Sequence, residues 1–459
     1  MKILLINPWI YDVASYDYWL KPLGLLMLAR NLHESGHELE LVDCLDRYDP
    51  ELETLTGKKP KSKWNGTGKF EDLVVKKPTS LSHIPRYFKR YGLPVELFVQ
   101  RLNALKNRGW SPDYIFVTSA MTYWYPGSFE AIRISGEIFP EARTVLGGNY
   151  ANLLPEHSRK SGADLICNES RMEKVLSFLR ENGIFIKEGL EEKLNLIPFY
   201  DLYKHHTSHL VFLTSLGCPY KCTYCATPFL QKFVQEDPLL LVDAVERYTQ
   251  MFAVSSVAFF DDAILINHEK HFDRILREII KRKMPEKGIM FHIPNGIHCK
   301  LLTEETARLM KAANVGTIKV AIETINPVLQ KETGAKVTNQ DFYHAVDLLK
   351  KAGFTKREIS AFVLINLPNQ TFDEAIEVHD ICKRLDIFPE INEYTPIPGT
   401  KDFIKVFNSL KLPEGFDPLQ LNNTILSFSW KDGLSVDEIE CIKNYNKKTV
   451  LEIKNKKGV

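Results

Sequence analysis

The chain has 459 residues, of which 44% are hydrophobic and 25% are charged, and its formal net charge is +1. This length suggests two domains, or one large barrel with an attachment. The charge balance does not point to nucleic acid or to an acidic membrane surface, and no stretch of about 18 uncharged apolar residues predicts a membrane span. The 8 cysteines are too few for a disulfide framework, so we expect reduced thiols and a cytoplasmic location.

Residues 1–187 alternate short apolar runs with amphipathic segments. The opening MKILLINPWIYD lacks a small-residue cleavage site and is typical of a first β-strand, not of a signal peptide. Pro22 begins a helical pattern that stops at Gly36. Strands are predicted at 3–6, 38–43, 114–119, 144–148 and 163–167, with further helices near 128–138, 155–161 and 171–182. This order predicts a flavodoxin-like (Rossmann-like) doubly wound parallel sheet.

Residues 47–111 interrupt this pattern, where a crossover is usually much shorter. We expect an insertion that forms a lid or packs on the domain, with its clearest helix at 94–107. Its GTGK turn (66–69) lacks the earlier glycine, the following Ser or Thr and the preceding buried strand of a phosphate-binding loop. A linker is predicted at 188–207.

From residue 208 the chain alternates strands and helices again. Strands are predicted at 209–215, 256–262, 288–294, 317–323, 359–366 and 390–396, and helices at 239–251, 270–281, 303–313, 339–352 and 371–385. Six βα units predict a partial (β/α)6 barrel of TIM type over 208–400, followed by a short helical C-terminal extension at 401–459. In such barrels the chemistry lies on loops at the carboxyl ends of the strands.

Three of the 8 cysteines share one such loop, in the stretch LGCPYKCTYCA at 216–226. Cys218, Cys222 and Cys225 are separated by three and then two residues, directly after the first barrel strand. Three thiolates from one loop can hold three corners of a 4Fe–4S cubane and leave one iron open to a chelating ligand. The alternative is a structural zinc site, whose fourth ligand would come from His205, His206 or His209.

With Tyr224 before the third cysteine, the loop resembles the C-x₃-C-x-Φ-C signature of the radical S-adenosylmethionine (SAM) superfamily. The resemblance implies that the three cysteines bind a 4Fe–4S cluster whose open iron chelates the amino and carboxylate groups of SAM. It also implies reductive cleavage of SAM to methionine and a 5′-deoxyadenosyl radical, with an external electron donor such as flavodoxin or ferredoxin. The protein would hold the cluster, orient SAM and exclude solvent.

The resemblance assigns SAM-binding roles to residues at several strand ends. The ring of Tyr224 is expected against adenine, with packing of the loop as the alternative. Phe260–Asp262 occupies the place of the family's glycine-and-acid motif, which this chain lacks. Asp261 or Asp262 would therefore bind the SAM amino group or, alternatively, cap a helix.

The later strand ends supply further SAM-binding candidates. Glu323 matches the acid that family members place on the ribose hydroxyls. Lys336 is a second candidate in the segment after it, with a solvent-facing side chain as the alternative. Asn366 stands where glycines are frequent in the family, and it is expected to contribute together with Asn295 and Pro396.

The domain ahead of the barrel resembles that of the cobalamin-binding radical SAM class. The resemblance rests on PLGLLMLARNLHESGHELELVD (22–43), VTSAMTYW (117–124) and VLGGNYANLLPEHSRKSGADLI (145–166). The motif D-x-H-x-x-G, by which other cobalamin proteins ligate cobalt, is absent from the sequence, so either the corrin has no protein histidine or the domain has lost its cofactor.

Ligands of doubly wound sheets bind outside the carboxyl ends of the strands, at the switch point. Gly147 and Gly148 would let the backbone approach a large ring, and Tyr123 and Trp124 would cover the lower face of the corrin. The residues expected to hold cobalamin are Asn7, Trp9, Thr118, Ser119, Met121, Tyr123, Trp124, Gly147, Gly148 and Asn149.

Three functions remain open on the sequence. The first is a cobalamin-dependent C-methyltransferase that acts on an unactivated carbon of a small molecule or lipid. The second keeps the radical without methyl transfer, as in an oxidoreduction, cyclisation or rearrangement. The third is a non-catalytic corrinoid- or metal-binding protein. A methylthiotransferase is disfavoured, because it would need three cysteines in the front domain, which has Cys44 and Cys167 alone.

Overall fold

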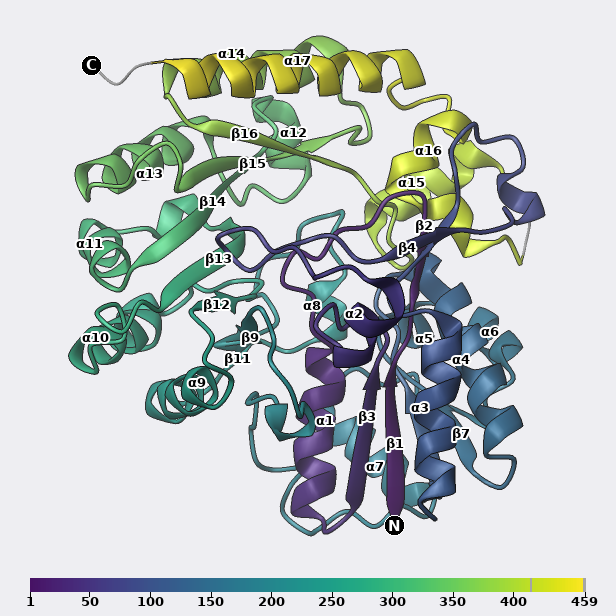
Figure 1. Cartoon of the computed structure of the whole chain (residues 1–459). Helices are drawn as coiled ribbons and strands as arrows, with labels where there is room; N and C mark the ends of the chain where they lie inside the picture. Colours follow the sequence, from purple (N-terminus) through teal and green to yellow (C-terminus); the bar gives the residue numbers. More distant parts are fainter. Residues whose placement is uncertain (413–414, 457–459) are drawn as a thin grey trace. The chain divides into compact units, whose positions relative to one another are not determined.

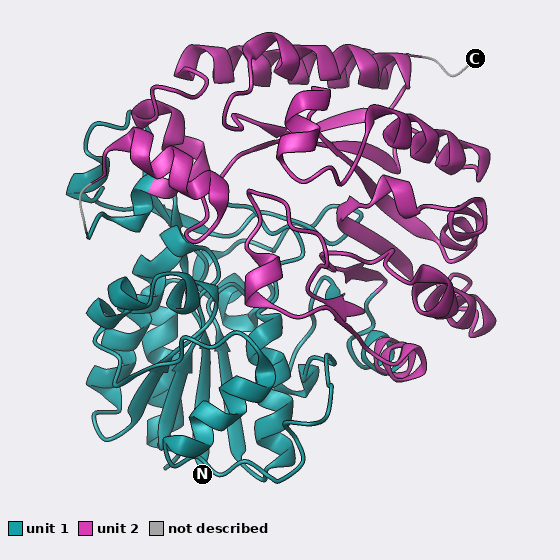
Figure 2. Ribbon diagram, turned by 180° about the vertical axis from the view of Figure 1, so that it is seen from behind, with its two compact units in different colours: residues 1–212, 247–254, 415–420 teal, residues 213–246, 255–414, 421–459 magenta. Residues whose placement is uncertain are grey.

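The computed structural model describes residues 1–412 and 415–456, and the chain folds into two compact units (Figures 1 and 2). Unit 1 comprises residues 1–212, 247–254 and 415–420. Unit 2 comprises residues 213–246, 255–414 and 421–459. Each unit is built around its own parallel sheet.

The sheet of unit 1 has five parallel strands in the order β3-β1-β6-β7-β8. Their bounds are β1 Lys2–Asn7, β3 Glu38–Asp43, β6 Tyr114–Val117, β7 Arg143–Leu146 and β8 Leu165–Ile166. The strand order reverses between β1 and β6, as in flavodoxin-like sheets. The predicted doubly wound fold is confirmed, and its switch point lies at the carboxyl ends of β1 and β6.

Alternate residues of β1 enter two separate cores. Ile3 and Leu5 pack with buried residues of α1 (Leu23–Glu34) and α7 (Met172–Glu181). Leu4 and Ile6 pack with buried residues of α3 (Val95–Asn107) and α4 (Tyr125–Ile138). A strand buried on both faces needs a continuous apolar run, which explains the sequence KILLIN. The short helices α5 (Asn149–Leu153) and α6 (Pro155–Ser158) follow β7.

The range predicted as an insertion, 47–111, contains a regular helix of the sheet and a small separate sheet. Helix α3 lies inside that range but packs on the sheet as a regular crossover helix. The residues before it form α2 (Pro50–Thr56), β4 (Asp72–Val74), the 3-10 turn η1 (Thr79–Leu81) and β5 (Lys89–Tyr91). Strands β4 and β5 join β2 (Ile10–Asp12) in an antiparallel sheet of order β2-β5-β4, which the sequence did not predict.

The glycine-rich turn of this insertion packs around Arg47. The guanidinium of Arg47 is paired with Asp17 at 2.8 Å and donates to the Gly66 carbonyl at 2.9 Å. A Cβ on Gly68 would lie 2.3 Å from Arg47 Nη1. The glycine therefore makes room for a buried side chain of the same unit, which agrees with the prediction that GTGK is not a phosphate loop.

The segment predicted as a linker, 188–207, is mostly exposed up to residue 194 and buried in unit 1 over 196–200. Leu190, Leu196 and Phe199 contribute to its interior, and a 3-10 turn, η4, spans Tyr200–Leu202. The hydroxyl of the fully buried Tyr200 donates to the Val211 carbonyl at 2.7 Å. These residues are part of a packed domain and not an extended tether.

The second sheet has six strands in the order β16-β15-β14-β13-β12-β9, which is the reverse of chain order. The strands are β9 Leu210–Phe212, β12 Ser256–Phe259, β13 Met290–Ile297, β14 Val315–Glu323, β15 Ile359–Ile365 and β16 Phe388–Glu393. All pairings from β12 to β16 are parallel. Strands that follow one another in chain order are the topology of the predicted partial barrel.

Helices alternate with these strands, and all of them except the short α12 lie where the sequence predicts a helix. They are α9 Pro238–Phe252, α10 Phe272–Lys281, α11 Glu304–Ala312, α12 Pro327–Glu332, α13 Asn339–Lys351 and α14 Phe372–Arg384. Thr338 and Thr371 begin α13 and α14 with complete capping boxes, which fix the helix starts.

The C-terminal extension is helical, as predicted. It contains α15 (Lys401–Leu410), the 3-10 turn η7 (Pro418–Leu421), α16 (Asn423–Ser429) and α17 (Val436–Asn455). Helix α17 packs along α14 (Figure 1), where the Tyr445 hydroxyl donates to Asp380 at 3.0 Å.

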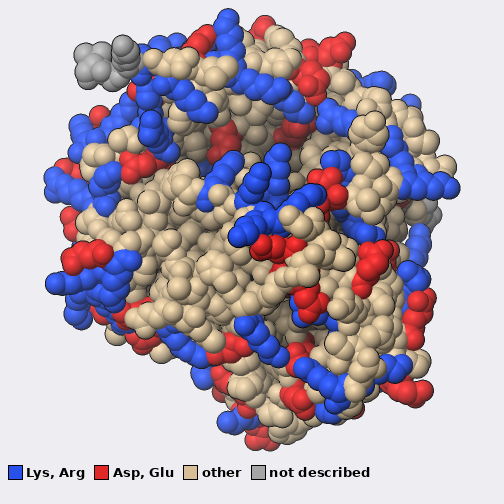
Figure 3. All heavy atoms as spheres, in the orientation of Figure 1, with Lys and Arg blue, Asp and Glu red and all other residues tan. Residues whose placement is uncertain are grey.

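Acidic and basic side chains are interspersed over the face shown in Figure 3, in keeping with the formal net charge of +1. No helix among residues 1–412 and 415–456 combines the length and apolar character that a bilayer crossing requires.

Gly148 is expected to be irreplaceable in the fold of unit 1. Its φ is +92°, and a Cβ would lie 2.2 Å from the Ser119 carbonyl oxygen. Gly148→Ala should lower the free energy of unfolding by roughly 1–3 kcal/mol, measured by urea denaturation. The matched control is Gly136→Ala in α4, where a Cβ meets nothing within 4 Å. This control should raise stability by about 0.5–1 kcal/mol, and equal effects of the two variants would contradict the close approach.

Candidate functional site

The three neighbouring cysteines lie in a loop whose two ends are held together by a short ladder. Strands β10 (Ser215–Leu216) and β11 (Val234–Gln235) pair antiparallel at the base of the loop, and α8 (Thr227–Leu230) lies within it. Gly217 has a φ of +83°, and a Cβ there would lie 2.6 Å from the Lys232 carbonyl oxygen. The loop thus starts and ends at one place, which we call the base of the cysteine loop.

A buried carboxylate fixes this base to the neighbouring strand end. Asp261 follows β12 and is 3% exposed. It accepts hydrogen bonds from the backbone N–H and the hydroxyl of both Thr214 and Ser215, at 2.5–3.1 Å. Burial raises the pKa of Asp261 to about 6, although these four donors act in the opposite direction.

The centre of the loop is held by Thr223. Its backbone N–H donates to the Thr333 carbonyl at 3.1 Å, and its hydroxyl donates to Asp402 at 2.7 Å. Gly334 passes so near the loop that a Cβ would lie 3.2 Å from the Cα of Cys222. The loop is therefore anchored to the segments that follow β14 and β16, as well as to β12.

The three thiols are all partly buried and all lie near the positive charge of Lys336. Cys218, Cys222 and Cys225 are half-buried and form no disulfide. Burial raises the pKa of all three, that of Cys222 to about 11, whereas Lys336 lowers each of them. Donors within the loop also act on them, from Tyr220 to Cys218 and from Thr227 to Cys225. Three soft donors beside a cation and hydrogen-bond donors suit an iron–sulfur cluster, which needs deprotonated thiols.

The zinc alternative would need a fourth ligand beside the three cysteines. The three histidines considered as a fourth ligand have other partners. His205 contacts Asp46 at 2.6 Å, His206 contacts the Phe252 carbonyl at 3.2 Å, and His209 contacts the Gly66 carbonyl at 3.3 Å.

A buried ionic network lies next to the thiols. The carboxylate of Glu323 accepts from Lys336 Nζ at 2.7 Å and from the hydroxyl of Tyr224. Burial lowers the pKa of Lys336, but the Glu323 carboxylate raises it by more, so the net shift is upward. Only 14% of the Lys336 side chain is exposed, so the solvent-facing alternative is wrong.

The direction of the Glu323 side chain is set by an irregularity at the end of β14. The register of β14 against β15 shifts between Ala321 and Glu323, and Glu323 has a φ of +61°. A bulge of this kind re-aims a side chain, and a left-handed glutamate is costly. The side chain is thereby aimed at Lys336 and Tyr224.

The other predicted SAM residues differ in how free their polar groups are. The side chain of Asp262 is accessible to solvent, but the protein atoms around it partly desolvate the carboxyl group and raise its pKa. A hydrogen bond with Thr227 acts in the opposite direction. Asn295 Nδ2 donates to the carbonyls of Phe260 and Asp261, at 3.1 and 3.0 Å. Pro396 is buried. Asp262 therefore has the carboxylate that is accessible to a ligand.

Two of the predicted SAM residues make structural contacts. All four hydrogen bonds of Asp261 go to the base of the cysteine loop, and its assignment to the SAM amino group stays a prediction. Asn366 is 2% exposed and accepts from the Leu434 N–H at 2.7 Å, so it fixes the C-terminal extension. The Tyr224 ring packs against a cluster that includes Leu367, Tyr394 and Trp430, which favours the alternative of loop packing.

In unit 1, several predicted cobalamin residues are engaged within the domain. Trp9 is 1% exposed, contacts Phe98 edge-on and donates to the Leu93 carbonyl at 2.6 Å, so its side chain is engaged within the domain. Asn7 donates to Asp43 at 2.6 Å, and the Ser119 hydroxyl donates to the Gly147 carbonyl at 2.7 Å. Gly148 makes room for the Ser119 backbone.

The aromatic pair after β6 is also covered from within unit 1. Tyr123 is buried, and Trp124 Nε1 donates to Asp12 at 2.7 Å on β2, the edge of the small antiparallel sheet. Thr118 and Met121 remain half-buried, and Gly148 and Asn149 are exposed. The accessible part of the predicted set therefore lies after β6 and β7, and Asn7, Trp9 and Tyr123 are buried.

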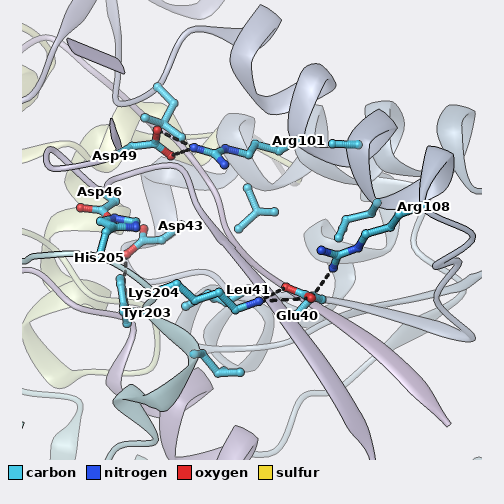
Figure 4. Close-up of a pocket in the computed structure, with 15 residues that line it drawn as sticks. Glu40, Leu41, Asp43, Asp46, Asp49, Arg101, Arg108, Tyr203, Lys204 and His205 are labelled. Carbon is cyan, nitrogen blue, oxygen red and sulfur yellow. Dashed lines mark hydrogen bonds and ion pairs between the residues drawn. The ribbon is translucent and has the colours of Figure 1, made fainter. Parts of the chain in front are cut away.

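A cavity of about 290 Å³ lies at the carboxyl end of β3, between this strand, α3 and residues 202–205 (Figure 4). Its charged groups pair with one another or with buried neighbours. Tyr203 donates to Asp43 at 2.5 Å, and Arg101 donates to Asp49 at 2.7 Å. Lys204 and Arg108 both contact Glu40. The polar groups that line the cavity are thus largely occupied by contacts within unit 1.

Comparison with known proteins identifies the class of the second domain. Residues 212–402 match the model of the radical SAM superfamily. This range contains the cysteine loop, Glu323 and Lys336. The second domain of the chain therefore resembles the radical SAM domain over this range.

More specific likenesses extend beyond that domain. An uncharacterized methyltransferase of Pyrococcus horikoshii is 21% identical over 378 residues, which cover 75% of this chain and 77% of the relative. An anaerobic magnesium-protoporphyrin IX monomethyl ester cyclase of Cereibacter sphaeroides is 22% identical over 353 residues, covering 67% of this chain and 56% of that enzyme.

Among solved structures, the radical SAM methyltransferase TsrM of Kitasatospora setae, with cobalamin and a [4Fe-4S] cluster bound, shares the fold. Its TM-score is 0.63 at 17% identity, covering 89% of this chain and 78% of that one. The similarity thus includes both the doubly wound domain and the barrel.

The structure predicts different effects for the two adjacent aspartates. Asp261→Ala would leave four donors at the base of the loop without their acceptor and should lower the free energy of unfolding by about 2–4 kcal/mol. Asp262→Ala should change stability by less than about 0.5 kcal/mol and instead weaken SAM binding. Chemical denaturation and calorimetric titration of SAM into cluster-loaded protein measure both effects. The reverse ranking would return the ligand role to Asp261.

Proposed function

We propose that this protein is a cobalamin-dependent radical SAM methyltransferase that acts on an unactivated carbon of a small molecule. The observation that carries the radical chemistry is the placement of three thiols beside Lys336 and Glu323 at the carboxyl end of a parallel barrel sheet. Loops at that end are where barrels of this kind place their reactive groups. Methyl transfer is supported by the methyltransferase among the relatives, and a small-molecule substrate by the near-neutral charge of the chain, with a lipid as the alternative.

A 4Fe–4S cluster, when bound, supplies the electron that cleaves SAM to methionine and a 5′-deoxyadenosyl radical. Cys218, Cys222 and Cys225 would hold the cluster at three corners. Asp262 offers an exposed carboxylate to the SAM amino group, and Glu323 offers acceptor oxygens to the ribose hydroxyls. Because Tyr224 and Lys336 already orient Glu323, its carboxylate is fixed before SAM arrives, which lowers the entropic cost of binding.

The corrinoid would lie at the switch point of unit 1. The residues free to contact it are Thr118, Met121, Gly148 and Asn149, since Asn7, Trp9 and Tyr123 are buried within the domain. A bound cobalamin supplies the methyl group that is transferred. The fold of unit 1 and its likeness to TsrM support this assignment.

A second candidate keeps the radical and omits methyl transfer. The cyclase among the relatives favours it, and the barrel residues would have the same roles in either reaction. An external electron donor such as flavodoxin or ferredoxin would serve both.

The cluster assignment is tested by replacing Cys218, Cys222 and Cys225 together with Ala. We expect the loss of iron, of labile sulfide, of absorbance near 400 nm and of all 5′-deoxyadenosine formation under reducing conditions. Cys441→Ala, at an exposed cysteine of α17, is the control and should leave all four unchanged. Continued cleavage of SAM by the triple variant would refute the assignment.

The corrinoid assignment is tested by reconstitution with hydroxocobalamin. We expect one corrinoid per chain after gel filtration, and formation of S-adenosylhomocysteine alongside 5′-deoxyadenosine during turnover. Asn149→Trp should reduce corrinoid binding at least tenfold without altering the iron content, because it adds bulk at an exposed position. 5′-Deoxyadenosine alone would favour the second candidate, and no retained corrinoid would reject the role of unit 1.

A further inference from the structure

A buried histidine lies beside one of the three thiols and was not among the residues predicted from the sequence. His298 follows β13 and is 1% exposed. Its Nε2 atom lies 3.9 Å from Cys218 Sγ, within the range of a hydrogen bond to sulfur. The two residues come from different strand ends of unit 2, so this contact exists only in the folded barrel.

The ring of His298 is held in place by the cysteine loop itself. It stacks on Tyr220, which lies between the first two cysteines, with 4.8 Å between ring centroids and 25° between planes. Its other nitrogen, Nδ1, is buried and has no hydrogen-bond partner among the described residues. Among the described residues, Cys218 Sγ is therefore the polar partner of the His298 ring.

The geometry decides which ring nitrogen donates. A thiolate can only accept a hydrogen bond, and Nε2 is the ring nitrogen that faces Cys218 Sγ. The proton therefore belongs on Nε2, because this tautomer makes the bond to sulfur and leaves Nδ1 as the bare acceptor.

We propose that His298 donates a hydrogen bond from Nε2 to the Cys218 thiolate when that thiolate binds the 4Fe–4S cluster, and that this bond raises the reduction potential of the cluster. The proposal rests on the proposed function, since it takes Cys218 as a cluster ligand. His298 is a positioning residue, because it acts on the cluster through the thiolate of Cys218.

The direction of the effect follows from charge. Reduction adds an electron, part of which resides on the sulfur ligands. A hydrogen bond to a thiolate stabilises the more negative, reduced state more than the oxidised state, and hydrogen bonds to sulfur are among the factors that set cluster potentials. The bond would make the cluster easier to reduce by its external donor.

The experiment compares variants that keep or remove the donor. His298→Phe keeps a ring against Tyr220 and removes the N–H, His298→Met removes both, and His298→Gln keeps an N–H near the sulfur. Tyr220→Phe is the matched control, because it keeps the ring stack and the backbone N–H that reaches Cys218. The reduction potential is measured by redox titration of the reconstituted full-length protein, followed by electron paramagnetic resonance.

We expect the Phe and Met variants to bind iron and sulfide as the wild type does, with the reduction equilibrium displaced about tenfold towards the oxidised cluster. For a one-electron couple, tenfold corresponds to 59 mV. The Gln and Tyr220→Phe variants should stay within threefold of the wild type. The wild type and Gln proteins should show one exchangeable proton coupled to the cluster that the Phe and Met proteins lack, whereas the protons of the Tyr220 and Thr227 donors should be present in all of them.

Two results would overturn the proposal. If the Phe and Met clusters load normally and titrate as the wild type does, His298 does not tune the potential, and the proposed function is unaffected. If the wild type binds no cluster at all, the proposal and the proposed function fall together. If the His298→Phe variant loads no cluster, the reduction potentials of the His298→Met and His298→Gln variants are compared instead. Equal potentials in these two variants would overturn the proposal.

Discussion

The four hydrogen bonds that Asp261 accepts from Thr214 and Ser215 hold the cysteine loop at the end of the barrel sheet. They fix the residues immediately before the loop, and the β10–β11 ladder then returns the chain to the same place. Thr223 anchors the centre. Three thiols can face one cluster only if the loop is closed at its base and held at its middle, so the rest of the site depends on these contacts.

The charged residues near the three thiols compensate for the negative charge that the thiols gain when they bind a cluster. Burial keeps the three thiols protonated, whereas iron requires thiolates, so loading the cluster releases protons and leaves negative charge in a low-dielectric region. Lys336 provides the compensating cation, and Glu323 keeps that cation in place at 2.7 Å. The strained backbone of Glu323 is therefore accounted for by its position between the cation and the expected ribose.

Unit 1 shows how internal packing competes with ligand binding at a switch point. The loop after β1 contributes Asn7 and Trp9 to internal hydrogen bonds, and β2 joins two strands of the insertion. The loops after β6 and β7 keep accessible groups. A corrinoid bound at this sheet would thus be contacted mainly by the loops after β6 and β7. Substitutions in these two loops are therefore the ones expected to weaken corrinoid binding.

The sequence by itself determined the class of both sheets and the three thiols, because hydrophobic periodicity and the spacing of three cysteines are local properties of the chain. It could not decide between a ligand role and a structural role for Asp261, Asn366 and Trp9, since their partners lie 46 to 84 residues away. The same holds for the β2-β5-β4 sheet and for His298, which meets Cys218 across 80 residues. Only the tertiary structure supplies these contacts, because the partners of a polar group are brought to it by the fold and not by its neighbours in the sequence.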